Sequence, residues 1–252
     1  MIHILNKRIC LLTSVFLLTM AHLLANVSCF FVEGAPGAGK TTLVQLISQK
    51  LPNVTTVYEP VESFTNVNGA GNILDLIFNN PNRWTFTAET YIALMHAKSV
   101  EDQVKSLHTS IMLFDRSIYA DRYVFGKMAL NSSNMNNIEW EIYKQIIDCI
   151  VKNITVKPHG FIYLQTTPQI ALERIRSREG KDAGKNDDSS LKFQKDLVLF
   201  YQEWFIEKKE IPEHLAQIPV LIIDATQNFK DDSVIQQQCI DQVKKFIEKY
   251  KN

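Results

Sequence analysis

The chain has 252 residues, 46% of them hydrophobic, which is enough for one α/β domain with a large core and excludes a disordered chain. Basic and acidic residues both total 27, so no net positive field exists to hold a nucleic acid polymer. The four cysteines follow no C-x-x-C spacing, which supports neither a zinc site nor a disulfide framework. Small-molecule chemistry with reduced thiols fits this composition best.

Residues 1–25 are an apolar segment that resembles a signal peptide. Lys7 and Arg8 precede a stretch, Ile9 to Ala25, that carries no charge. Cleavage at its end, retention as an anchor and a start at Met20 stay open as alternatives. The stretch is short for a membrane span, which needs about 20 apolar residues. We therefore separate this segment from one folded domain, residues 26–252.

A phosphate-binding loop opens the folded domain. Residues 34–41 read GAPGAGKT and match the pattern G-x-x-x-x-G-K-[ST] without a mismatch. The apolar run Cys29 to Val32 before it predicts a buried strand, and the apolar spacing from Thr42 to Ile47 predicts a helix. Backbone N–H groups of such a loop surround an anionic phosphate at the start of the helix. The residues expected to bind the nucleotide phosphates are Gly34, Ala35, Pro36, Gly37, Ala38, Gly39, Lys40, Thr41 and Thr42.

Apolar runs and helical stretches then alternate along the chain. Further strands are predicted at Val54 to Tyr58, Ile111 to Phe114, Phe161 to Leu164 and Val220 to Ile223. Between them, helical periodicity covers Trp84 to Leu107, Glu139 to Val151 and Leu191 to Lys208. This alternation predicts an α/β fold in which helices flank a parallel sheet. Ligands bind such sheets at the carboxyl ends of the strands.

Charged residues stand at those strand ends. Glu59 follows the second strand, and Asp115 and Arg116 end the third. Phosphoryl transfer to a hydroxyl needs a carboxylate to accept the proton and cations to neutralise the phosphate. We therefore predict Glu59 as general base, Asp115 with Thr41 as Mg²⁺ partners, and Arg116 as a clamp that orients Glu59 and touches phosphate. With Lys40, which should reach the β and γ phosphates, Glu59 and Arg116 form the predicted catalytic set.

An arginine-bearing lid is predicted after the fourth strand. Arg174 and Arg178 share one face of a helix that starts at Pro168, and both could swing over a bound nucleotide. The following stretch, Gly180 to Ser190, is rich in Gly, Asp, Ser and Lys and is predicted to be a mobile loop. The alternative is that these cations complement the helix C-terminus.

Together these motifs resemble the deoxynucleoside kinase family, which includes deoxycytidine, deoxyguanosine and mitochondrial thymidine kinases. The resemblance covers residues 29 to about 235, and its most specific block reads DRSIYADRY over residues 115–123. It implies a P-loop NTPase fold with a five-stranded parallel sheet, usually in a homodimer. It also implies Mg²⁺-dependent transfer of phosphate from ATP, or another nucleoside triphosphate, to the 5′-hydroxyl of a deoxynucleoside in nucleotide salvage. Residues 26–252 are then the kinase domain.

By position, the resemblance also implies a nucleoside pocket. Phe64 and Phe86 would be its walls, Arg116 would contact substrate, and Asp121 would lie near the base. Glu89 stands where the family has a base-reading glutamine, and His96 stands where arginine is frequent. A carboxylate only accepts hydrogen bonds and suits the two adjacent N–H donors of guanine, so we expect a purine preference, deoxyguanosine first. The alternative for Glu89 is a solvated glutamate on a helix.

The sugar contacts differ from the family pattern as well. Phe78 replaces a tyrosine that binds the 3′-hydroxyl, and Ala183 replaces an acidic lid residue. With both contacts missing, selection at the 3′ position is expected to be loose, unless Asp182 substitutes after a one-residue shift.

Two other functions stay open. A nucleoside monophosphate kinase of the thymidylate type has a similar loop, but its acceptor pocket needs more cations than this sequence offers. A membrane-attached NTPase switch would use residues 9–25 as its anchor and would hydrolyse ATP without an acceptor. The ATP requirement and the unpaired cysteines favour the cytoplasm, whereas residues 1–25 resemble an export signal, so the location stays open. Membrane contact is expected only if residues 9–25 are retained.

Overall fold

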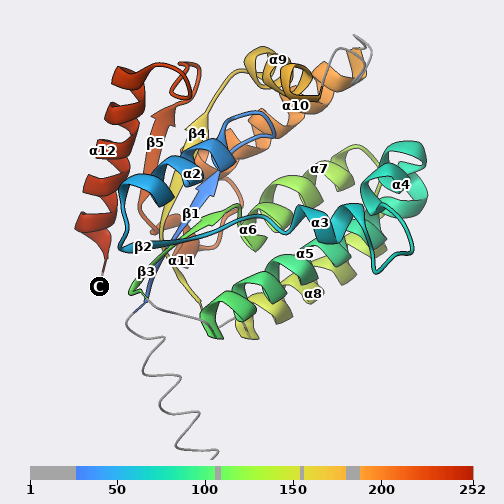
Figure 1. Cartoon of the computed structure of the whole chain (residues 1–252). Helices are drawn as coiled ribbons and strands as arrows, with labels where there is room; N and C mark the ends of the chain where they lie inside the picture. The colour runs from blue at the N-terminus through green and yellow to red at the C-terminus, as the bar shows by residue number, and fades with distance from the viewer. Residues whose placement is uncertain (1–26, 106–108, 154–155, 180–187, 252) are drawn as a thin grey trace, which may run out of the picture.

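The computed structural model describes residues 27–105, 109–153, 156–179 and 188–251 (Figure 1). Five parallel strands form one sheet in the order β2-β3-β1-β4-β5. Each strand overlaps one of the predicted apolar runs, which confirms the α/β fold with a five-stranded parallel sheet. The strands are β1 (Ser28–Glu33), β2 (Val54–Val57), β3 (Ile111–Asp115), β4 (Pro158–Gln165) and β5 (Val220–Asp224).

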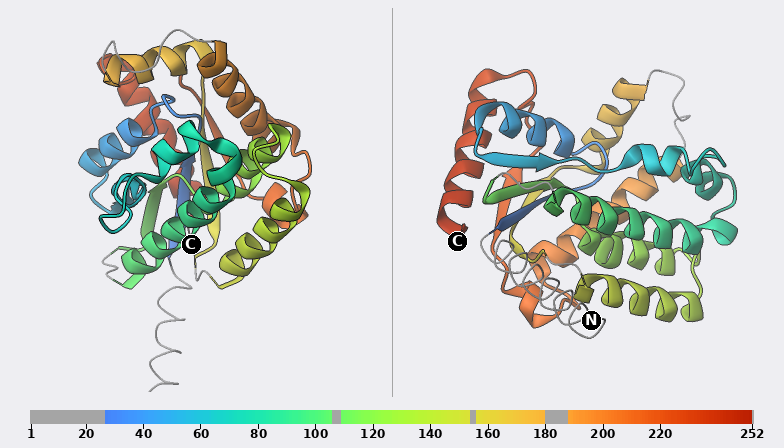
Figure 2. Two further views of the ribbon diagram at one scale, coloured as in Figure 1. Left: turned by 90° about the vertical axis from the view of Figure 1, so that its right-hand side faces the viewer. Right: turned by 60° about the horizontal axis from the view of Figure 1, so that its bottom comes forward.

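Helices cover both faces of the sheet (Figure 2). Along β1, Phe30 and Val32 join a core with α2 and α12, whereas Phe31 joins the core on the other side, with α8, α10 and η2. This alternation follows from the period of two in a strand. The helices are α2 (Lys40–Lys50), α3 (Val61–Thr65), α4 (Ile73–Asn79), α5 (Pro81–Lys105), α6 (Ile118–Ala120), α7 (Gly126–Asn131), α8 (Asn137–Asn153), α9 (Pro168–Glu179), α10 (Asp188–Gln202), α11 (Glu213–Ala216) and α12 (Ser233–Tyr250), with π-helical turns η1 (Asp121–Phe125) and η2 (Glu203–Glu207).

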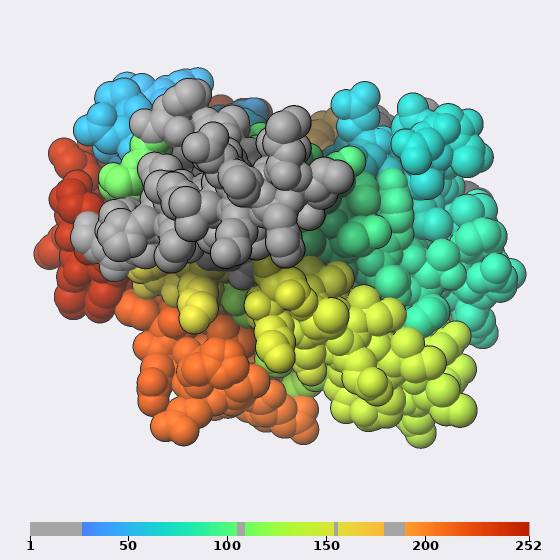
Figure 3. Space-filling model, turned by 90° about the horizontal axis from the view of Figure 1, so that it is seen from below, coloured from blue at the N-terminus to red at the C-terminus, as the bar shows by residue number. Residues whose placement is uncertain are grey.

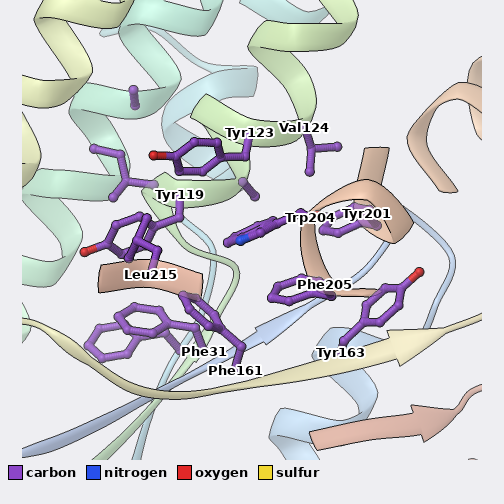
Figure 4. Close-up of a cluster of buried hydrophobic side chains, with 14 of the residues drawn as sticks. Phe31, Tyr119, Tyr123, Val124, Phe161, Tyr163, Tyr201, Trp204, Phe205 and Leu215 are labelled. Carbon is purple, nitrogen blue, oxygen red and sulfur yellow. The ribbon is translucent and has the colours of Figure 1, made fainter. Parts of the chain in front are cut away.

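A cluster of aromatic rings joins β4 to α10 and η2 (Figure 4). Tyr163 of β4 stacks on Tyr201 of α10 with ring centroids 5.8 Å apart, and Trp204 stacks on Phe205 at 4.1 Å. All four side chains are buried. Rings of this size bury large apolar areas, so the cluster holds α10 firmly against the sheet.

The long helices agree with the predicted periodicity, with small differences at their ends. α5 begins at Pro81, where proline is favoured because its missing N–H is not needed in the first turn. The predicted loop Gly180 to Ser190 is wrong at its end, because α10 already begins at Asp188; the rest of the stretch, residues 180–187, lies outside the described part. The apolar segment 1–25 also lies outside it. Among the described residues, no helix is both long and apolar enough to span a membrane.

Candidate active site

Three glycines shape the phosphate loop between β1 and α2. Gly34, Gly37 and Gly39 have φ angles of 149°, 86° and 101°, which residues with side chains rarely adopt. A Cβ atom at Gly37 would lie 2.2 Å from the carbonyl oxygen of Ala171, and one at Gly39 would lie 2.6 Å from the ring of Phe229. The loop therefore needs glycine both for its turns and for its close packing.

Lys40 begins α2 and folds its side chain back over the loop. Its Nζ donates to the carbonyl oxygens of Gly34 at 3.0 Å and Ala35 at 3.4 Å. Burial, with the nearby charge of Arg116, lowers the pKa of Lys40 to about 8. The ammonium group thus lies within the loop, where phosphate oxygens can replace the two carbonyl acceptors.

Thr41 and Asp115, the two predicted Mg²⁺ partners, lie together at the carboxyl end of the sheet's strands. Asp115 is next to Val32 in the pairing of β3 with β1, so the end of β3 meets the start of α2. Oγ1 of Thr41 donates to Oδ2 of Asp115 at 2.5 Å, whereas Oδ1 of Asp115 is buried without a hydrogen-bond partner. A buried, unpartnered carboxylate oxygen is a suitable ligand for a hard cation.

Glu59 and Arg116 form an ion pair beside the same loop. Nε of Arg116 donates to Oε1 of Glu59 at 2.9 Å. Burial alone would raise the pKa of Glu59, but Arg116 and His96 outweigh it and hold this pKa well below its usual range. Arg116 has a φ of 75°, in the left-handed region that is costly for a residue with a side chain. The structure therefore brings together the predicted base and its clamp.

His96 of α5 bridges two carboxylates. Its Nδ1 lies 2.7 Å from Oδ2 of Asp121, and its Nε2 lies 3.5 Å from Oε1 of Glu59. Burial would lower the pKa of His96, but Asp121 and Glu59 together raise it to about 10, so the ring is an imidazolium at neutral pH. The edge of this ring also meets Phe64, with centroids 5.6 Å apart. His96 itself does not line the cleft described below.

Glu89 of α5 is buried but borders the cleft. Burial, reinforced by the charge of Asp121, raises the pKa of Glu89 to about 8, while His96 and Arg116 act in the opposite direction. Glu89 is therefore mostly protonated at neutral pH. A protonated carboxyl group donates one hydrogen bond and accepts others, so at this pH it resembles a carboxamide rather than the carboxylate assumed from the sequence.

A cleft of about 1070 Å³ is lined by most of these groups, but not by Asp115 or His96. It runs from the phosphate loop past Glu59 and Arg116 to residues of α4, α5 and α7. Phe86, a predicted pocket wall, instead packs against the core and is not among the lining residues, whereas Phe64 is. Sequence patterns do not single out Phe125, Met128 or Ala129, which also line the cleft, because apolar residues there look like core. Among the predicted site residues, the lining includes Pro36, Gly37, Gly39, Lys40, Thr41, Thr42, Glu59, Phe64, Phe78, Glu89, Arg116, Asp121, Arg174 and Arg178.

The predicted lid arginines lie on α9 and border the cleft. Arg174 donates to three backbone carbonyl oxygens, those of Ala225 at 2.7 Å, Thr226 at 3.3 Å and Gln227 at 3.1 Å. It therefore ties α9 to the loop after β5, a contact that the sequence does not predict.

Of the two residues expected to alter the sugar contacts, Ala183 lies outside the described residues. Phe78 borders the cleft with 78% of its surface exposed.

Comparison with known proteins identifies relatives over most of the chain. The family model described as deoxynucleoside kinase matches residues 30–248. Deoxycytidine kinase 2 of Gallus gallus and deoxycytidine kinase of Homo sapiens are each 29% identical, over 86% of this chain and 89% of their own. The mitochondrial deoxyguanosine kinase of Xenopus laevis is 25% identical, over 86% of this chain and 88% of its own. With the phosphate loop and the Glu59–Arg116 pair on one cleft, this match shows that the chain belongs to the deoxynucleoside kinase family.

Proposed function

We propose that this enzyme transfers the γ-phosphate of ATP to the 5′-hydroxyl of a deoxynucleoside, in nucleotide salvage. The observation that carries the proposal is the position of Glu59, a carboxylate held by Arg116 on the same cleft as the phosphate loop. A carboxylate fixed there can receive the proton of an acceptor hydroxyl as that oxygen attacks phosphorus. The family membership supports the same reaction.

Each part of the cleft then has one role. The loop N–H groups and Lys40 hold the donor phosphates, and Lys40 balances charge on the transferred group. Arg116 keeps Oε1 of Glu59 in place and adds positive charge next to the acceptor oxygen. Because Glu59 has a depressed pKa, it stays ionised across the whole neutral range. The apolar residues Phe64 and Met128 exclude water around the acceptor.

Thr41 and Asp115 are the residues we propose to hold Mg²⁺. The buried, unpartnered Oδ1 of Asp115 supports this assignment. Among the described residues no group of three or more His, Cys, Asp or Glu side chains could hold a metal ion. That fits an ion bound by one or two protein ligands together with phosphate oxygens and water. When bound, such an ion neutralises charge on the phosphoryl group.

The reaction is tested by incubating the full chain with ATP and Mg²⁺ and each of the four deoxynucleosides or their monophosphates. Phosphate transfer to a deoxynucleoside is the expected result. Transfer only to monophosphates would move the enzyme to the thymidylate-kinase type of reaction. ATP hydrolysis without a phosphorylated acceptor would favour the NTPase switch.

We propose further that base choice depends on the ionisation of Glu89. The charged groups that act on it are Asp121 of η1, His96 on its own helix and Arg116 after β3. The ionised carboxylate accepts from both N–H donors of guanine, whereas the protonated group donates and accepts and so matches cytosine or adenine. The expected preference for deoxyguanosine therefore grows as the pH rises through about 8.

This preference is tested by measuring kcat/KM for deoxyguanosine and deoxycytidine between about pH 6.5 and pH 9. The ratio should rise with pH in the wild type and stay constant in the Glu89→Gln variant, whose amide does not titrate. A ratio with the same pH dependence in both proteins would refute the role of Glu89.

A homodimer is the assembly we propose. Ile138 and Ile142 lie one turn apart on α8 and are 73% and 44% exposed, and α8 packs beside α5 at the surface shown in Figure 3. Exposed apolar side chains on one helical stripe favour contact with a second copy of the chain. Light scattering should give twice the mass of one chain for the wild type, and one chain mass for Ile138→Glu.

A further inference from the structure

We infer that Tyr201 and Glu33 are positioning residues for phosphoryl transfer, because a buried chain of hydrogen bonds runs from Glu33 through the Tyr201 hydroxyl and Arg116 to Glu59. This inference rests on the proposed function. It assigns a role to two side chains that do not line the cleft and that lie 168 residues apart in the sequence.

The chain of contacts is continuous. The hydroxyl of Tyr201 donates to Oε2 of Glu33 at 3.3 Å and accepts from Nη1 of Arg116 at 3.0 Å. Nε of the same guanidinium group donates to Oε1 of Glu59 at 2.9 Å. Arg116 is thus held at two separate nitrogens, one facing the proposed base and the other facing the interior.

Glu33 fixes the backbone near Arg116 by a second contact. Its other oxygen, Oε1, accepts from Oγ of Ser117 at 2.5 Å. The two oxygens of the buried Glu33 carboxylate therefore hold two consecutive residues. Oε1 binds Ser117 directly, and Oε2 holds Arg116 through the Tyr201 hydroxyl. This support explains how Arg116 keeps a φ of 75°, because a strained backbone persists only where its surroundings over-determine it.

Burial makes these contacts strong and their loss costly. Glu33 and Tyr201 are fully buried, and Arg116 is 7% exposed. No bulk water is available there to replace a missing hydroxyl, so the guanidinium would lose a partner and gain freedom to turn away from Glu59. Since Glu33 and Tyr201 do not line the cleft, they should affect the rate through Arg116 and leave nucleoside binding largely unchanged.

Tyr201→Phe removes only the hydroxyl and keeps the ring in its aromatic cluster (Figure 4). Tyr163→Phe is the matched control, because Tyr163 is buried in the same cluster, stacks on Tyr201, and has no part in the chain of hydrogen bonds. We expect kcat to fall about tenfold in Tyr201→Phe and the KM for deoxynucleoside to stay within about twofold. Tyr163→Phe should keep the wild-type kcat.

Glu33→Gln provides a second test if Tyr201→Phe folds poorly. The amide keeps the shape of the side chain but replaces one accepting oxygen by an NH2 group, so Tyr201 and Ser117 can no longer both donate to it, and kcat should again fall while KM is maintained. In the double variant, Tyr201→Phe with Glu33→Gln, the two losses of kcat should not multiply, because both substitutions interrupt the same chain of hydrogen bonds. All rates are expressed per ATP-binding site, counted by equilibrium dialysis, so that a smaller folded fraction is not mistaken for slower chemistry.

The results separate the inference from the proposed function. A wild type that phosphorylates no deoxynucleoside refutes the proposed function and this inference with it. An active wild type whose Tyr201→Phe and Tyr163→Phe variants share one kcat refutes the inference alone. Losses that multiply in the double variant would also overturn it, because they would show two independent effects.

Discussion

The donor side and the acceptor side of the cleft are built by different means. The donor side is a short continuous segment, residues 34–41, whose shape comes from glycine backbone and whose proposed phosphate ligands are mainly N–H groups. The acceptor side collects ionisable side chains, buried or half-buried, from distant parts of the chain, among them Glu59, Glu89, His96 and Asp121. The difference predicts that the donor side is sensitive to added atoms, whereas the acceptor side is sensitive to charge and pH.

The largest effect is expected at the acceptor side from Glu59→Gln. The amide keeps the size of the side chain but cannot accept the proton of the hydroxyl, so kcat should fall by about 10²- to 10⁴-fold. ATP binding, measured by calorimetry, should be unchanged, because the phosphate loop does not involve Glu59. The control is Glu62→Gln, at an exposed position on α3, which should keep full activity. Comparable activity of the two variants would exclude Glu59 as the base.

His96→Gln tests whether charge balance holds the acceptor side together. Removing the imidazolium leaves Glu59 and Asp121 without the cation between them, so the free energy of unfolding should fall by about 3 kcal/mol. His96 has a folded-state pKa of about 10, above its ordinary value of 6.5. The stabilisation that protonated His96 gives to the folded state is therefore complete below pH 6.5 and is lost as the pH rises through about 10.

Urea unfolding of the wild type and His96→Gln at about pH 6 and about pH 9.5 measures this difference. The gap between the two proteins should be smaller at the higher pH. The control is His214→Gln, an exposed histidine on α11, which should match the wild type at both values. A gap that is independent of pH would mean that His96 acts by packing alone.

The donor side is tested with a matched pair of glycines. Gly37 and Gly69 have similar φ angles, 86° and 80°. A Cβ atom added at Gly37 would meet the carbonyl of Ala171, whereas a Cβ atom added at Gly69 would have no atom within 4 Å. Gly37→Ala should therefore cost about 2 kcal/mol more in unfolding free energy than Gly69→Ala. It should also raise the KM for ATP, while Gly69→Ala keeps the wild-type KM. Equal costs would show that backbone strain, and not close packing, requires glycine in the loop.

The smallest effect is expected from Phe78→Tyr. Phe78 offers only carbon atoms to the cleft, so the wild type should accept 2′-deoxy and 2′,3′-dideoxy nucleosides with similar kcat/KM. Tyrosine restores a hydroxyl that can pair with the sugar, and the preference for the 3′-hydroxyl should rise about fivefold. A large deoxy preference already present in the wild type would show that another residue reads the 3′ position.

The backbone shape of the phosphate loop could be predicted from the sequence, because it depends on residues that are neighbours in the chain. The strand ends at Glu59 and Asp115 could also be placed, since parallel strands share one carboxyl edge. The ionisation of Glu89 could not, because it depends on burial, which only the folded chain defines. The hydrogen bond from Arg116 to Tyr201 could not be predicted either, because it joins residues 85 positions apart and leaves no local pattern in the sequence.

The backbone contacts of Arg174 determine which substitutions this part of the molecule can tolerate. Within the described part of the chain, the guanidinium group of Arg174 donates to three backbone carbonyls in the loop after β5, and every amino acid provides such a carbonyl. The side chains of Thr226 and Gln227 take no direct part in this attachment and instead donate to Asp224, the last residue of β5. Lysine at position 174 could not replace the arginine, because a single ammonium lacks the planar fork that reaches three acceptors at once. The attachment of α9 to this loop thus depends on one side chain of the helix and on the backbone of the loop that it holds.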